Sequence, residues 1–97
     1  MRSRFLSVAE TELADAVEYY QLEADLGERF LAVITKTLTV LEKQPMIGRL
    51  VDSTLRSFPV PTFPFSLIYE IVNDEIVVVA VAHHRRSPKY WSTRTIG

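Results

Sequence analysis

Apolar residues recur at steps of three and four through the first part of the chain, which is the repeat of a helix with one buried face. The repeat runs through Ala9, Leu13, Val17 (with Ala16), Tyr20 and Ala24. Ser7 and Glu10 have the spacing of a capping box, so the helix is expected to begin there. The acidic residues of this segment lie mostly outside the apolar stripe. They form either a solvated face or a charged surface that has a functional role.

A second helix is predicted after a short break. Asp25 precedes Glu28 by three residues, which again indicates a capping box. The apolar repeat that follows is Phe30 or Leu31, Ile34, Leu38 and Leu41. Pro45 ends this helix at Gln44, because the residue before a proline disfavours helical geometry. The break is short, so the two helices are expected to form an antiparallel hairpin.

Outside the helices, the periodicity changes to that of strands. The predicted strands are residues 2–6, 55–60, 65–72 and 75–82. Pro59 and Pro61 make the second of these irregular or place it at an edge. Asn73-Asp74 predicts a tight turn between the last two strands. The final strand is apolar at nearly every position, so we expect it at the centre of the sheet.

These elements predict an α+β fold in a single domain spanning residues 1–97. An N-terminal strand is followed by an antiparallel helical hairpin, which packs on a small antiparallel sheet of three or four strands (βααβββ). Residues 45–53 are expected to be loop, and residues 88–92 a short C-terminal helical turn.

Composition excludes several classes of function. The chain has no cysteine, so disulfides, cysteine nucleophiles and cysteine-based metal sites are absent. It has three glycines and no glycine-rich phosphate loop, which argues against a nucleotide cofactor. No apolar run spans a bilayer and none resembles a signal peptide, so we expect a cytoplasmic protein without a membrane partner.

The net charge of −1 hides an asymmetry along the chain. Seven acids and no base lie between residues 10 and 28. From residue 83 onward there are four bases and no acid, namely Arg85, Arg86, Lys89 and Arg94. A local basic patch of this kind binds phosphate or an acidic partner even on a slightly acidic protein.

The segment HHRRSPKYW, from His83 to Trp91, therefore contains most of the candidate catalytic and binding residues. Histidine has a pKa near neutrality and serves as a general acid or base, although a strand-end histidine bonded to backbone is an equal alternative. Adjacent strand residues point to opposite faces, so His83 and His84 are poorly placed to share a metal ion. We expect neither a metal nor a cofactor.

The neighbouring side chains add cations and aromatic rings. Arg85 and Arg86 offer planar forks to phosphate or carboxylate, and three roles stay open: RNA phosphate, a partner protein, or an ion pair with the acidic helix. Tyr90 is a candidate for base stacking or proton transfer. Trp91 either joins this surface or covers the sheet edge as core. Arg56 and Lys89 are further candidate binding residues.

Four stretches together resemble the RelE/ParE superfamily of bacterial toxins. They are LGERFL (26–31), the helix end at Gln44-Pro45 with Gly48, FPFSLIYEI (63–71) and IVVVAVAHHRRSPKYW (76–91). The resemblance implies the βααβββ fold and a toxin of a type II toxin–antitoxin module, inhibited by a cognate antitoxin in a hetero-oligomer. RelE-like members cut mRNA on the ribosome, whereas ParE-like members poison DNA gyrase.

The resemblance also suggests roles for individual residues. In a RelE-like ribonuclease, His83, His84, Arg86 and Tyr90 are the implied catalytic groups. Arg56, Arg85, Arg86, Lys89 and Trp91 are implied contacts to phosphate, target or antitoxin. Relatives often carry tyrosine and arginine where this chain has Phe65 and Glu70, and further charges where it has residues 60–62.

Because a ribosome-binding nuclease needs many phosphate contacts, these departures favour the ParE-like growth inhibitor. The RelE-like nuclease and a non-toxic interaction domain remain the alternatives. The antitoxin is expected to cover the Arg85/Arg86 surface with an acidic-tipped or amphipathic segment.

Overall fold

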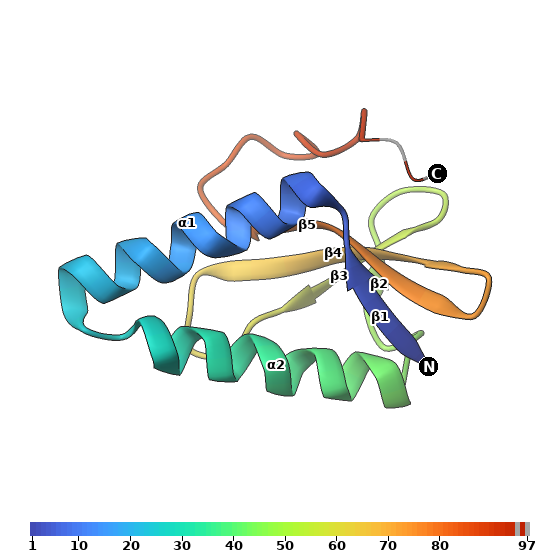
Figure 1. The fold of residues 1–97 in the computed structure, drawn as a ribbon. Helices are drawn as coiled ribbons and strands as arrows, with labels where there is room; N and C mark the ends of the chain where they lie inside the picture. The colour runs from blue at the N-terminus through green and yellow to red at the C-terminus, as the bar shows by residue number, and fades with distance from the viewer. Residues whose placement is uncertain (95, 97) are drawn as a thin grey trace.

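The chain folds into two helices and a five-stranded sheet in a computed structural model that describes residues 1–94 and 96. The elements in chain order are β1 (Arg2–Phe5), α1 (Ser7–Ala24), α2 (Gly27–Lys43), β2 (Arg49–Leu50), β3 (Leu55–Pro59), β4 (Phe65–Val72) and β5 (Glu75–His83). The α+β class, the helical hairpin and the long strands are therefore confirmed. Figure 1 shows both helices on one face of the sheet, with the C-terminal segment turning back from the end of β5.

The sheet order is β1-β5-β4-β3-β2, so β5 has a strand on each side, as its apolar sequence predicts. The expectation of an antiparallel sheet is wrong at one edge, because β1 pairs with β5 in parallel, from Arg2 opposite Glu75 to Phe5 opposite Val78. The partner of a short terminal strand is set by how the helical hairpin returns the chain, which local periodicity does not report.

Residues 45–53 are not entirely loop. Arg49 and Leu50 form β2, which pairs antiparallel with Ser57 and Arg56. A strand of two exposed residues has no alternating pattern to detect. With β2 on its far side, β3 is covered at the edge of the sheet, and it pairs with β4 over five residue pairs.

Both predicted capping boxes are wrong. Helix α1 is preceded by Leu6 and α2 by Leu26, and neither helix has a side-chain cap. Asp25 instead ends α1 in the left-handed region, with φ of 57°. The Gln21 amide stabilises this corner, because its Nε2 donates to Asp25 and its Oε1 accepts from the Gly27 amide. This bridge lets the chain reverse between the two helices within three residues.

Two apolar layers pack on the two faces of the sheet. Between the sheet and the helices, Phe30, Ile34 and Leu41 of α2 pack against inward residues of β4 and β5, including Leu67 and Val78. We call the other side the outer face. There a smaller cluster consists of Ile68, Val79, Ala80 and Ala82, partly covered by Tyr90, Trp91 and Ile96. The C-terminal segment therefore covers the outer face of the sheet, as the two helices cover the opposite face.

A β-bulge in β5 decides which side chains face the helices. Tyr69 pairs with Val78 and Ile68 pairs with Ala80, so Val79 is an extra residue without a partner on β4. The alternation of side chains along β5 shifts by one at this point. Val78 and Val81 therefore both belong to the helix-side core, although simple alternation would place them on opposite faces.

Among the described residues, no helix is long and apolar enough to cross a membrane.

Candidate functional site

The segment after β5 is a series of turns rather than the predicted helical turn at residues 88–92. Successive backbone hydrogen bonds run from the Tyr90 amide to Ser87, from Ser92 to Lys89, and from Arg94 to Trp91. Lys89 has φ of 59°, in the left-handed region, which interrupts any right-handed helix. The segment can therefore follow the sheet instead of coiling away from it.

The two histidines lie on opposite faces of the sheet, as adjacent strand residues should. Because of the bulge, His83 faces the helices, where its ring contacts Phe65 edge-to-face at a centroid distance of 4.9 Å. His84 is exposed, and its Nε2 lies 3.0 Å from the Ser66 hydroxyl. The Nδ1 of His83 accepts a hydrogen bond from the Arg85 amide. Each imidazole therefore has its own surroundings and its own partner.

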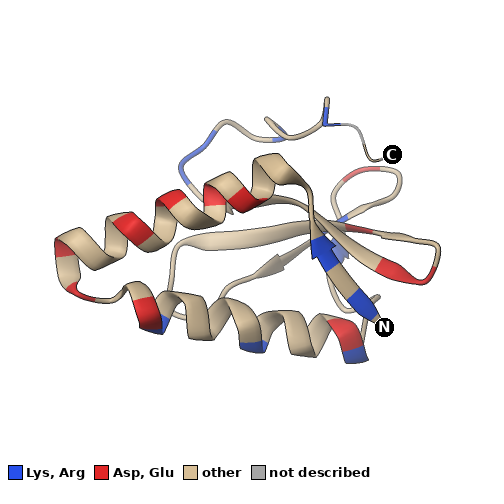
Figure 2. Cartoon of the chain, viewed as in Figure 1, with Lys and Arg blue, Asp and Glu red and all other residues tan. Residues whose placement is uncertain are grey.

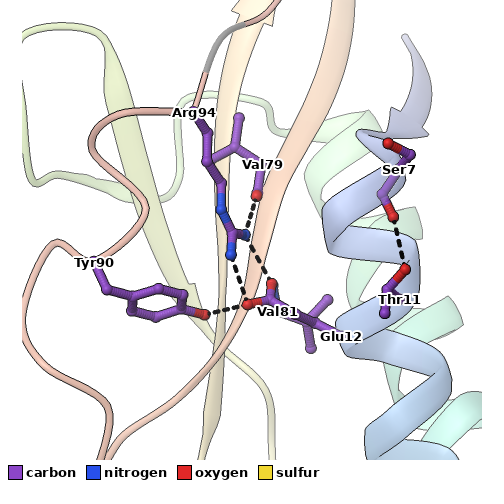
Figure 3. Close-up of polar contacts among 7 residues, drawn as sticks. All are labelled: Ser7, Thr11, Glu12, Val79, Val81, Tyr90 and Arg94. Carbon is purple, nitrogen blue, oxygen red and sulfur yellow. Dashed lines mark hydrogen bonds and ion pairs between the residues drawn. The ribbon is translucent and has the colours of Figure 1, made fainter.

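Glu12 of α1 is the centre of the most extensive polar cluster in the described part of the chain (Figure 3). Its carboxylate accepts hydrogen bonds from the Tyr90 hydroxyl at 2.7 Å and from both terminal nitrogens of Arg94 at 2.9 Å. It also accepts one from the Val81 amide at 3.0 Å. Nη1 of Arg94 donates in addition to the Val79 carbonyl at 2.6 Å. We call these three residues, Glu12, Tyr90 and Arg94, the Glu12 cluster.

The Glu12 cluster closes an open edge of the sheet. Strand β1 pairs with β5 only as far as Val78, so the Val79 carbonyl and the Val81 amide lie beyond its end. Unpaired backbone groups at a strand edge invite association with other chains. Here a guanidinium N–H and a carboxylate oxygen bond to them, as the N–H and C=O of a neighbouring strand would.

The cluster shifts the pKa of each of its members. Burial alone would raise the pKa of the Glu12 carboxyl, but hydrogen bonds from Arg94, Tyr90 and the Val81 amide lower it overall. Burial, together with the hydrogen bond to Glu12 and its charge, raises the pKa of Tyr90 to about 12. The Tyr90 proton is therefore held tightly on the phenol, which makes this residue a poor proton donor or acceptor near neutral pH.

Arg86 is held over the face of Tyr90, with its guanidinium carbon 3.9 Å from the ring centroid. Arg85 and Lys89 are exposed, and in the described part of the chain no ion pair involves either of them or Arg86. An ion pair with the acidic helix, one of the three roles left open for Arg85 and Arg86, is made by Arg94 instead. Figure 2 shows the acids along α1 and the bases of the C-terminal segment.

Arg56 does not join the His83–Trp91 segment. Its Nη1 donates to the carbonyls of Met46 and Gly48, so it holds the loop before β2. Tyr69 holds the same loop, because its hydroxyl donates to the Pro45 carbonyl and accepts from the Gly48 amide. These bonds occupy Nη1 of Arg56, and its role as a binding residue stays a prediction. Arg56 faces the same side of the sheet as its partner Tyr69, toward the helices.

Trp91 packs against the outer-face cluster, which confirms the interpretation of its ring as cover for the sheet. Its indole nitrogen is buried without a hydrogen-bond partner in the described structure. No group of three or more His, Asp or Glu side chains among residues 1–94 and 96 is arranged to hold a metal ion.

Sequence reasoning overlooked Glu12, and it counted Arg94 only as one of the bases. A signal for Glu12 was present. It lies three residues after Ala9 and four before Ala16, the two fully buried positions of α1, so it belongs to the buried stripe rather than the solvated face. A carboxylate on such a stripe requires a buried partner, and Arg94 is that partner.

The C-terminal site residues divide into three groups. Tyr90 is bonded within the Glu12 cluster, and Arg86 stacks on it. His83 and His84 lie on opposite faces, and a hollow at the end of the sheet is lined by both together with Arg86. Arg85 and Lys89 are exposed to solvent.

Comparison with known proteins agrees with this architecture. Residues 4–88 match the model of the family described as the ParE toxin of the type II toxin–antitoxin system parDE. A comparison with curated protein sequences found no match. A solved structure titled as the chromosomal ParDE TA system from P. aeruginosa has a TM-score of 0.75 and 16% sequence identity to this chain. That alignment covers 86% of this chain and 95% of the other, and at this identity it shows the shared fold. With 85 of its 97 residues matched by the family model, the chain belongs to the ParE toxin family of type II toxin–antitoxin systems.

Proposed function

We propose that this toxin arrests growth by binding DNA gyrase, without catalysing a reaction of its own, and that a cognate antitoxin inhibits it by covering its surface. Membership in the ParE family supports the toxin class. The choice of a binding mechanism over mRNA cleavage depends chiefly on one observation, the donation of the Tyr90 hydroxyl to Glu12.

Three of the four candidate catalytic residues, His83, His84 and Arg86, line one hollow, but Tyr90 is not among the residues that line it. The Tyr90 hydroxyl donates a hydrogen bond to the Glu12 carboxylate, whose lowered pKa keeps it charged near neutral pH. His83 faces the helices, whereas His84 lies on the outer face. General acid–base catalysis needs its donor and acceptor within hydrogen-bond reach of one substrate. The arrangement therefore favours a binding surface.

A surface for the antitoxin is formed by the helical hairpin. An open, largely apolar groove of about 500 Å³ runs along α1, with Leu22 and Leu31 at one end. Leu22 is 76% exposed and Leu31 is 44% exposed, so the groove presents an exposed apolar patch of the kind that marks an interaction site. Glu10 and Glu18 flank the groove. These features fit the apolar face of an amphipathic antitoxin helix with basic residues along its sides.

The exposed Arg85 and Arg86 provide a second contact, for the acidic tip expected of the same antitoxin. Arg85→Ala/Arg86→Ala should weaken antitoxin binding and reduce its dependence on salt, because two cations no longer attract the acidic segment. Salt-insensitive binding as tight as wild type by this double variant contradicts the contact.

The groove is tested with Leu22→Arg, which places a cation among apolar side chains. The antitoxin should bind at least about tenfold more weakly, as measured by calorimetry, because a charge buried at an apolar interface remains unpaired. Met46→Arg is the matched control, since Met46 is an equally apolar side chain that is 68% exposed and lies outside the groove. Equal affinity of the two variants rules out the groove.

The target is tested by inducing the toxin alone in cells and mapping plasmid topology and mRNA 5′ ends from the same culture. Tyr90→Phe, which keeps the ring but removes the proton, is induced alongside. Relaxed or broken DNA with intact mRNA, and toxicity retained in Tyr90→Phe, are the expected results. New mRNA ends at codon positions that vanish in Tyr90→Phe support the RelE-like nuclease instead. No growth arrest indicates a non-toxic interaction domain.

A further inference from the structure

The outer face of the sheet carries a row of polar side chains next to its apolar cluster. The strand register places Arg49 opposite Ser57, and Ser57 opposite Ile68. Paired residues on neighbouring strands point to the same face, so these three form a row across β2, β3 and β4. Ser66 follows on the same side of β4, opposite Ala82. Ile68 and Ala82 belong to the outer-face cluster, which fixes the side on which this row lies.

The C-terminal segment forms the opposite wall of a hollow over this row. His84, Arg86 and Ser87 line one part of it, about 230 Å³ in volume, above Ile68 and Ala82. A second part of about 350 Å³ continues toward β2 and β3. Both parts share Arg49, Ser57, Ser66 and His84. The two parts therefore form one continuous site, which we call the outer-face hollow.

The outer-face hollow is rich in hydrogen-bond donors and positive charge. Neither part is lined by an aspartate or a glutamate. Within the described residues, Arg49 and Arg86 make no ion pair. Stacking on Tyr90 occupies the flat face of the Arg86 guanidinium and leaves the N–H groups at its edge for a ligand. The hollow on the helix side shares His83 and Arg86 with this site, but Glu12 and Asp15 also line it and repel anions.

We propose that the outer-face hollow binds the phosphoryl group of a phosphate ester. A planar carboxylate is satisfied by one arginine fork, whereas a tetrahedral phosphoryl group has oxygens that accept from several directions. Here two guanidinium groups, two imidazoles and three serine hydroxyls surround one hollow. The apolar floor of Ile68 and Ala82 lowers the local dielectric and strengthens the attraction. Phosphate binding at this site requires neither gyrase nor the antitoxin.

The test is an NMR titration of the full chain with inorganic phosphate, following the backbone amides of Arg49, Ser57 and Ser66 and the His84 ring. Saturable shifts confined to these residues are expected, with the amides of α2 unmoved. Arg49→Gln and Arg86→Gln should each weaken binding about tenfold, because each removes a charged hydrogen-bond donor. Arg29→Gln, an exposed arginine on α2, is the matched control and should leave the affinity unchanged.

Three further ligands identify the chemical class of the ligand and its source. Acetate should bind at least about tenfold more weakly than phosphate, because it cannot use all the donors. Acetate binding as tight as phosphate, or shifts that do not saturate, overturns the proposal. So does unchanged phosphate affinity in both Arg49→Gln and Arg86→Gln. A 5′-mononucleotide and a dinucleoside monophosphate then compare a phosphate monoester with a diester. If either binds more strongly than inorganic phosphate, the result supports the site and shows which kind of ester it takes.

Discussion

Glu12 accepts more hydrogen bonds than is usual for a glutamate on a surface helix. Its carboxylate accepts from Tyr90, Arg94 and the Val81 amide, and its side chain is 15% exposed. Partners separated by 78 and 82 residues in sequence are therefore held together by one side chain. Removing one member of such a partly buried pair leaves the others with unmet hydrogen bonds, which is the costly case for a polar cluster.

Glu12→Ala should lower the free energy of unfolding by about 2–4 kcal/mol, measured by urea denaturation at neutral pH, because Arg94, Tyr90 and the Val81 amide all lose their acceptor. Glu18→Ala is the control, as an exposed glutamate in the middle of the same helix, and it should change stability by less than about 0.5 kcal/mol. Equal effects of the two substitutions contradict the structural role of the Glu12 cluster.

Because of Tyr90, the contribution of the Glu12 cluster to stability should depend on pH in the alkaline range. The pKa of Tyr90 is raised from 10.0 to about 12 by burial and by the hydrogen bond to Glu12. A pKa that is higher in the folded state means that the folded state holds the proton more tightly. The resulting stability is complete below about pH 10 and is lost as the pH rises from about 10 to about 12.

Tyr90→Phe should remove this contribution, so the difference in unfolding free energy between wild type and variant should shrink as the pH rises from about 10 to about 12. Tyr20 and Tyr69 also have raised pKa values, but they are present in both proteins and cancel in the comparison. Stability curves that stay parallel across this range exclude the assignment.

The hairpin between β4 and β5 shows how local sequence and backbone geometry agree at the scale of an element. Asn73 and Asp74 were predicted to form a tight turn, and both have positive φ, of 50° and 60°. These angles describe the two central residues of a type I′ turn, whose twist matches that of the strands. Asparagine tolerates this geometry well, whereas aspartate at the second position is less favourable than glycine.

Asp74→Gly should therefore raise the free energy of unfolding by about 0.5–1 kcal/mol, because glycine adopts positive φ without steric cost. Asp52→Gly is the matched control. Asp52 has no positive φ, and its carboxylate accepts from the Ser53 amide, so the same substitution there should destabilise the protein. Thermal or urea unfolding of the two variants gives opposite signs if the turn geometry is correct.

At the scale of the whole molecule, the fold was largely predictable from sequence, whereas the pairing of distant parts was not. The limits of β4 match the prediction, and those of β5 differ by one residue, because long alternating or apolar runs mark a strand locally. The parallel partner of β1 and the two-residue β2 depend on contacts between distant segments. No local pattern reports such contacts.

The sequence predicted which segment carries the candidate site, but not how the side chains of that segment are arranged. The basic, aromatic segment from His83 to Trp91 was identified from composition, yet the face on which each histidine lies depends on the extra residue Val79. Without that bulge, alternation from Val78 would place His84 toward the helices. Glu12 and Arg94 were missed as a pair because 82 residues separate them.

The position of β5 also sets the order in which this toxin can acquire its shape during synthesis. β5 lies between β1, which is made first, and β4, and nearly all of its residues are buried. Until β5 leaves the ribosome, β1 has no neighbouring strand, the helical hairpin lacks much of the surface on which it packs, and Glu12 has none of its hydrogen-bond partners. A nascent chain that stops before β5 therefore lacks the core of the sheet, so this domain cannot present its folded surface until β5 has been made.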